Sequence, residues 1–146
     1  MSDSMSPADL YRRSLRLLLD KDIDGWVALV ADDALFEFPY APDGFPSKLE
    51  GKEAVAAYMR GYPGSIDLRE VVGLEIHELR DGDTVVAEWR GTGRIVATGA
   101  AYEMPYVAVV TVEDGQITAY RDYWNPLAIP GSPADAAFFD AVPENA

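Results

Sequence analysis

The chain has 146 residues and carries 25 acidic against 12 basic side chains, which gives a formal net charge of −13. Such an acidic surface repels phosphate backbones and anionic lipids, so nucleic acid and membranes are not expected as partners. The absence of cysteine excludes disulfides, zinc–thiolate sites and cysteine nucleophiles, and it suits a reducing compartment such as the cytoplasm. No apolar stretch approaches the roughly 20 residues that span a bilayer, and the polar start lacks the pattern of a signal peptide.

The first half of the sequence predicts three helices and one short strand. A helix begins at Ser6, whose side chain can cap it, and ends near residue 20. A short second helix follows at 22–30, and alternation of apolar residues predicts a strand within 32–39. A loop rich in proline and glycine then leads to a third helix at 51–61, which Pro63-Gly64 is expected to end.

The second half predicts long strands joined by tight turns. Asp81-Gly82-Asp83 and Glu113-Asp114-Gly115 are typical of hairpin turns. Gly91 and Gly93 indicate a sharp bend or a bulge within one strand. The four expected strands are 68–80, 84–96, 102–112 and 117–124.

Helices followed by a run of antiparallel strands predict an α+β fold, in one domain over residues 1–146 with its core at about 8–127. Three helices can cover only one face of the sheet. The other face, which carries Val107 and Val109, would stay bare in a monomer, so a homodimer is expected. In the tail at 128–146, Phe138 and Phe139 are expected to dock on the domain or on a partner, because exposing both would be costly.

Three segments resemble the ketosteroid-isomerase-like superfamily, also called the nuclear transport factor 2 fold. They are Asp22-Ile23-Asp24-Gly25-Trp26 with its continuation to Ala34, Gly51-Lys52-Glu53-Ala54-Val55, and Glu113-Asp114-Gly115-Gln116-Ile117 followed by 120–126. The resemblance implies a curved antiparallel sheet that forms a cone with the three helices and encloses a pocket. Within the superfamily, the endings Arg121-Asp122-Tyr123-Trp124-Asn125-Pro126 and Glu88-Trp89-Arg90-Gly91-Thr92-Gly93 are most similar to SnoaL-like polyketide cyclases and phenazine-biosynthesis A/B proteins. This fold serves enzymes and binding proteins alike, so the likeness alone does not define an activity.

Several of the superfamily's known sites are incomplete in this sequence. By an ungapped match, the ketosteroid isomerase base falls on Phe38, its tyrosine near Ser14 and its second acid near Ala108, and none carries the required group. The histidine that the phenazine proteins use has no counterpart in 51–61. The Arg and Asp pattern of limonene-epoxide-hydrolase-like proteins is interrupted at Trp89-Arg90-Gly91.

Asp122 is the candidate proton-transfer group. The resemblance implies an acid/base residue at this position of the last strand, on a face that points into the cone. Period-two alternation puts it between Tyr120 and Trp124 on that face, and a carboxyl group among aromatic rings has a raised pKa. The alternative is that Asp122 pairs with Arg90 or Arg121 and only fixes the strand.

Two tyrosines are candidates for orienting a substrate oxygen. Tyr106 shares its strand face with Met104 and Ala108, and Tyr40 follows the first strand at the expected pocket mouth. Ordinary aromatic packing is the alternative for both. The expected pocket wall consists of Ser14, Phe36, Phe38, Met59, Trp89, Met104, Ala108, Tyr120 and Trp124.

No metal and no cofactor are expected. His77 is the single histidine, so it cannot form a multi-histidine metal site, and it is predicted to lie exposed on a strand beside Glu75. The favoured function is a cofactor-independent acid/base cyclase, isomerase or dehydratase acting on an apolar or aromatic ring compound. The first alternative is a non-catalytic small-molecule-binding or scaffold protein. The second is an epoxide hydrolase that would need Glu88 and Arg90 beside Asp122.

Overall fold

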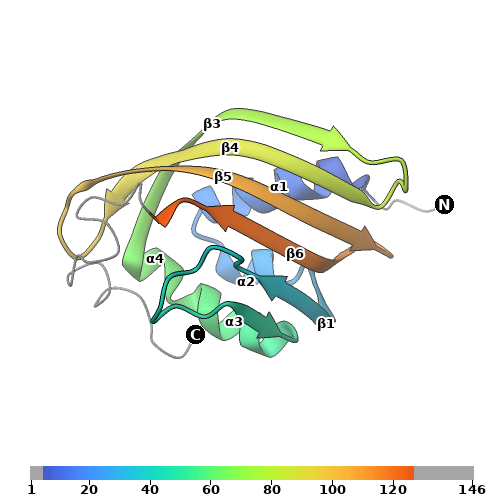
Figure 1. Cartoon of the computed structure of the whole chain (residues 1–146), viewed down its shortest axis with the longest axis horizontal. Coiled ribbons are helices and arrows are strands. Elements are labelled where there is room, and N and C mark those ends of the chain that lie inside the picture. Colours follow the sequence, from blue (N-terminus) through green and yellow to red (C-terminus); the bar gives the residue numbers. More distant parts are fainter. Residues whose placement is uncertain (1–4, 127–146) are drawn as a thin grey trace.

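The computed structural model describes residues 5–126, which form one curved sheet and four helices. The strands arch over the helices, which lie on the concave side of the sheet (Figure 1). This architecture confirms the predicted α+β cone. The helices are α1 (Pro7–Leu19), α2 (Ile23–Val27), α3 (Lys52–Arg60) and α4 (Tyr62–Ser65), and the strands are β1 (Val30–Glu37), β2 (Lys48–Glu50), β3 (Ile66–Glu78), β4 (Thr84–Ile95), β5 (Ala101–Glu113) and β6 (Gln116–Trp124).

The helix α1 begins where the sequence predicts. The Ser6 hydroxyl accepts a hydrogen bond from the Asp9 backbone N–H at 3.1 Å, and Pro7 occupies the first turn, where a missing N–H costs nothing. Tyr11, Leu15 and Leu18 follow at helical spacing and are buried against the sheet. The apolar face of α1 therefore closes one side of the space under the sheet.

The strand order in the sheet is β2-β1-β6-β5-β4-β3. All neighbouring pairs are antiparallel except β1 and β6, which run parallel. The parallel pair brings the first strand beside the last, so Phe36 of β1 lies next to Tyr120 of β6. This pairing of distant segments brings the residues of the pocket together.

Two short elements were not predicted. The strand β2 has only three residues and follows the loop rich in proline and glycine. The helix α4 starts immediately after α3, and Pro63 lies in its first turn instead of ending the helical region. Proline is tolerated there because the first-turn N–H groups have no partner inside the helix.

Gly91 and Gly93 allow β4 to approach neighbouring groups closely. A Cβ at Gly93 would lie 1.9 Å from the backbone oxygen of Asp67 on β3, whose register shifts between Leu68 and Glu70. A Cβ at Gly91 would lie 2.9 Å from the Trp89 ring. The bulge that the glycines indicated therefore lies on the partner strand, and the glycines leave room for it and for Trp89.

The sheet has one buried face and one face turned to solvent. Val85, Ala87 and Val110 are buried under the helices, whereas Val107 on the other face is 38% exposed. None of the helices between residues 5 and 126 is long and apolar enough to cross a bilayer. Phe138 and Phe139, which were expected to dock, lie outside the described residues.

Candidate functional site

A cavity of about 120 Å³ lies between the concave face of the sheet and the four helices. This volume accommodates a small organic molecule and not merely one or two waters. Its wall is mostly aromatic and includes all three tryptophans of the chain. Of the residues expected to line the pocket, the structure places Phe36, Phe38, Met59, Trp89, Met104, Tyr120 and Trp124 on this wall, together with Asp122 and Tyr106.

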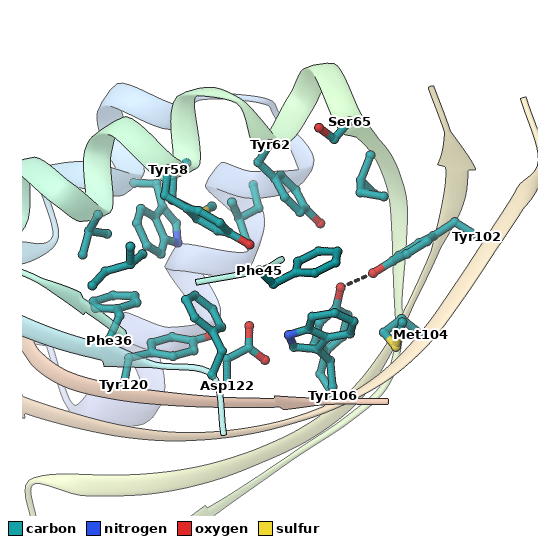
Figure 2. A pocket seen from close by; sticks show the side chains of 18 of the residues that line it. Phe36, Phe45, Tyr58, Tyr62, Ser65, Tyr102, Met104, Tyr106, Tyr120 and Asp122 are labelled. Carbon is teal, nitrogen blue, oxygen red and sulfur yellow. Dashed lines mark hydrogen bonds between the residues drawn. The ribbon is translucent and has the colours of Figure 1, made fainter. Parts of the chain in front are cut away.

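Asp122 lies on β6 and extends into the cavity between Tyr120 and Tyr106 (Figure 2). Its Oδ1 atom is buried and has no hydrogen-bond partner within the described part of the chain. Burial disfavours the charged form, which raises the pKa of Asp122 to about 7. The carboxyl group can therefore both donate and accept a proton near neutral pH.

The arginines that could have neutralised Asp122 are directed elsewhere. Arg90 forms an ion pair with Glu103, with 2.9 Å between Nε and Oε2. Arg121 is exposed, as alternation along β6 requires for a residue next to the inward-facing Asp122. The alternative reading of Asp122 as one half of a structural ion pair has no support in this geometry.

Tyrosine phenols surround the carboxyl group. Tyr58 and Tyr62 extend toward it from the helices, and Tyr102 and Tyr106 lie on β5 with their hydroxyls hydrogen-bonded to each other (Figure 2). Burial raises the pKa of each of these phenols, and the negative charge of Asp122 raises it further. All therefore stay neutral near pH 7 and can donate hydrogen bonds to an oxygen in the cavity.

A chain of hydrogen bonds supports the wall from behind. The indole Nε1–H of Trp89 donates to the Tyr11 hydroxyl at 2.8 Å, and the hydroxyls of Tyr11 and Tyr120 lie 3.2 Å apart. The Tyr120 ring stacks on Phe36 with 4.8 Å between centroids. These contacts link α1, β1, β4 and β6 and hold Tyr120 in the wall beside Asp122.

Three of the predicted site residues do not reach the cavity. Tyr40 is 61% exposed, and its ring packs on Tyr123 at the outer side of the sheet instead of at the pocket mouth. Ser14 is buried, but its hydroxyl donates to the backbone oxygen of Tyr11 at 2.6 Å, so it serves the helix. Ala108 is fully buried opposite Asp122 in the β5–β6 pair, and its short side chain does not reach the cavity wall.

Sequence reasoning missed several residues of the site. Tyr102 alternates with Met104 and Tyr106, so period two along β5 would have identified it. Tyr11 lies one turn before Leu15 on the buried face of α1, which helical periodicity also indicates. Phe45 comes from the loop before β2 and packs on Trp124, and no local pattern predicts such a loop contact.

His77 lies outside the cavity, on the convex face of the sheet. Its side chain is 54% exposed, as predicted, and its Nε2 lies 2.9 Å from Glu88 and 3.9 Å from Glu75. Glu88 therefore contacts His77, and Arg90 pairs with Glu103, on the face of the sheet opposite Asp122. The epoxide hydrolase arrangement, which needs Glu88 and Arg90 beside Asp122, is not formed.

Comparison with known proteins identifies the family. The SnoaL-like domain family matches residues 11–120. The PhzA/B-like protein PA3332 of Pseudomonas aeruginosa is 37% identical over 123 residues, which cover 84% of this chain and 86% of that protein.

Two solved structures extend this comparison. A Bacillus subtilis structure assigned provisionally as an isomerase is 37% identical, with a TM-score of 0.80 and coverage of 88% of this chain and 95% of that one. RV0760c of Mycobacterium tuberculosis, in complex with estradiol-17beta-hemisuccinate, is 27% identical, with a TM-score of 0.73 and coverage of 85% and 98%. Together with the family match over most of the sequence, these similarities show that the chain belongs to the SnoaL-like domain family.

Proposed function

We propose that the protein is a cofactor-independent acid/base enzyme, a cyclase, isomerase or dehydratase, that acts on an apolar ring compound bearing at least one polarisable oxygen. The observation that carries this proposal is the buried, unpartnered Oδ1 of Asp122 in an aromatic cavity. A carboxyl group with a pKa of about 7 is suited to move a proton at neutral pH. The ring-lined wall supports an apolar substrate.

The phenols of β5 supply the second half of the proposed chemistry. Tyr106 and Tyr102 lie on the cavity wall with their hydroxyls paired. A carbonyl oxygen that accepts from one of them would be polarised, which acidifies the neighbouring C–H for removal by Asp122. Tyr40, at the outer side of the sheet, has no part in this arrangement.

The experiment measures proton exchange at the carbon next to a carbonyl, because the proposed reactions share this elementary step. The protein is incubated in D2O with 2-tetralone, and deuterium uptake at the carbon next to the carbonyl is followed by NMR. We expect the wild-type protein to take up deuterium into 2-tetralone faster than buffer alone does. The acceleration given by Asp122→Asn should be at least about 100-fold smaller than that of wild type. The matched control is Asp33→Asn, which removes an exposed carboxylate on β1 and should retain the full rate. Equal rates in wild type and Asp122→Asn would refute the proposal.

A non-catalytic binding function is the second candidate. Asp122 is the one carboxyl group among the described residues of the cavity wall, and no His, Lys or Arg accompanies it there. RV0760c was solved with a steroid derivative bound, so a protein of this fold holds a ring compound. A protein that binds 2-tetralone but shows no accelerated exchange would favour this function.

We also propose that the protein forms a homodimer through the convex face of the sheet. Val107 is exposed there on β5, and Val109 on the same strand, Val86 on β4 and Tyr123 on β6 are half-buried near it. A second copy would remove this apolar surface from water.

A further inference from the structure

The charges around the cavity are of one sign. The wall contains the carboxyl group of Asp122, and no Lys, Arg or His of residues 5–126 lines it. The sequence outside that range, at 1–4 and 127–146, contains no Lys, Arg or His either. No basic side chain of this chain therefore neutralises a ligand's negative charge in the cavity.

Within the described residues, the carboxylate of Asp122 lacks a hydrogen-bond donor at one oxygen. Its buried Oδ1 accepts no hydrogen bond from the described protein atoms. An ionised carboxylate in this position loses the solvation of water without receiving protein donors in return, which is costly. A ligand that supplies an N–H and a positive charge would remove both deficits at once.

The aromatic wall favours a cation in the same way. Tyr106 and Tyr120 lie on the two sides of Asp122 (Figure 2). Trp89 stacks on Tyr106 with 4.4 Å between ring centroids, and Phe36 stacks on Tyr120 at 4.8 Å. Ring faces attract cations through their quadrupole, and the attraction grows when the cation is desolvated. The net charge of −13 adds a field over the whole surface that attracts cations and repels anions.

From these observations we infer that the cavity binds monovalent organic cations, specifically primary ammonium groups attached to one apolar ring, with the ammonium on Asp122 and the ring among the aromatic side chains. A carboxylate group placed beside Asp122 would meet a like charge, and the described wall offers it no basic side chain. This ligand class goes beyond the proposed acid/base function. An amine bound in this way would compete with a neutral substrate for the same carboxyl group.

The test uses benzylamine as the cation and benzyl alcohol as a neutral molecule of nearly the same shape. Isothermal titration calorimetry at about pH 8 should give benzylamine an affinity at least about tenfold higher than that of benzyl alcohol. In Asp122→Asn, which keeps the shape and removes the charge, that preference should disappear. In Asp33→Asn, which changes the net charge by the same amount at an exposed site, it should remain. Equal binding of the two molecules by wild type would overturn the inference.

The pH dependence of benzylamine binding to the wild-type protein tests the same pairing of the ammonium group with Asp122. Benzylamine stays protonated up to about pH 9, so the titrating group is Asp122, whose pKa of about 7 lies within the range. The affinity for benzylamine should fall about tenfold for each pH unit below 7 and stay constant above pH 7. Binding at pH 7 should release about half a proton per benzylamine bound. Calorimetric titrations in two buffers of different ionisation enthalpy measure this release. Affinity that is independent of pH between about 5.5 and 8, with no proton released, would contradict the pairing.

The other titratable groups whose charge interacts with Asp122 are phenols that stay neutral in this range: Tyr11 on α1, Tyr58 on α3, Tyr62 on α4, Tyr102 and Tyr106 on β5, and Tyr120 on β6.

The outcomes separate this inference from the proposed function. Asp122-dependent binding of benzylamine together with no accelerated exchange on 2-tetralone would refute the acid/base proposal and leave the cation site standing. Accelerated exchange on 2-tetralone without a preference for benzylamine would refute the cation site and leave the acid/base proposal standing. Thermal unfolding of each variant shows whether a loss of binding reflects the site or the fold.

Discussion

The indole N–H of Trp89 on β4 donates to the hydroxyl of Tyr11 on α1, with 2.8 Å between the two atoms. The Tyr11 side chain is completely buried, and that of Trp89 nearly so. The bond joins the first helix to the middle of the sheet behind the cavity, and it gives a partner to an indole donor that burial would otherwise leave unsatisfied.

Replacement of Tyr11 by phenylalanine should therefore destabilise the protein. The Trp89 N–H would stay buried without its acceptor, and such a donor costs about 1–3 kcal/mol. Urea denaturation measures the change in the free energy of unfolding. Tyr40→Phe is the control, because Tyr40 is exposed and its removal should alter that free energy by less than about 0.5 kcal/mol. Equal effects of the two variants would show that the bond adds no stability.

The stability of the protein should fall between about pH 4 and pH 7. Burial raises the pKa of Asp122 from its ordinary value of 3.8 to about 7 in the fold, so the folded state binds more protons than the unfolded state between these values. Stability then decreases as pH rises through this range, by up to about 4 kcal/mol for a shift of about three units. Asp122→Asn, which cannot ionise, should lack this part of the slope and exceed wild type in stability at pH 8. Denaturation curves at pH 5 and pH 8 measure both effects, and parallel pH profiles for the two proteins would contradict the prediction.

An alanine at position 93 should be poorly tolerated. Its Cβ would lie 1.9 Å from the Asp67 backbone oxygen, so β3 and β4 would have to separate at the bulge. We expect a loss of at least about 2 kcal/mol in the free energy of unfolding. Gly64→Ala in α4 is the matched control, since nothing lies within 4 Å of its added Cβ and alanine favours a helix. Comparable melting temperatures for the two variants would rule out the close approach as a constraint.

A charge at position 107 should separate the proposed homodimer. Val107→Glu places a carboxylate among the exposed apolar side chains of the convex face, where a second copy of the chain would bury it. Size-exclusion chromatography with light scattering should give a dimer for wild type and a monomer for the variant. Val96→Glu adds the same charge at a residue that is 50% exposed in the turn after β4, and it should remain dimeric. A wild-type monomer would exclude the assembly.

Local patterns were sufficient to predict the main elements. The capped start of α1, the two hairpin turns and the alternation along β5 and β6 each depend on neighbouring residues, so the sequence specifies them directly. The same alternation puts Tyr120, Asp122 and Trp124 on one face of β6, and the family resemblance implied that this face points into the cone. The short elements β2 and α4 depend on tertiary contacts and on the tolerance of a first helical turn for proline, so propensity alone misses them.

The cavity wall was harder to predict because it combines distant segments. The parallel pairing of β1 with β6 places Phe36 beside Tyr120, although 84 positions separate them in the sequence. The ungapped match put Ser14 where the related enzymes have a tyrosine, whereas here the buried phenol of α1 is Tyr11, one turn earlier. A shift of one helical turn keeps a residue on the same face, so pattern alone could not decide which of the two faces the wall.

The positions of Trp26, Trp89 and Trp124 have a practical consequence. Each of them borders the cavity, and the chain has no other tryptophan. Every indole therefore changes its surroundings when a molecule enters, so the intrinsic emission of the unlabelled protein should report occupancy directly. Large compound collections could be screened by light alone, before any reaction is known.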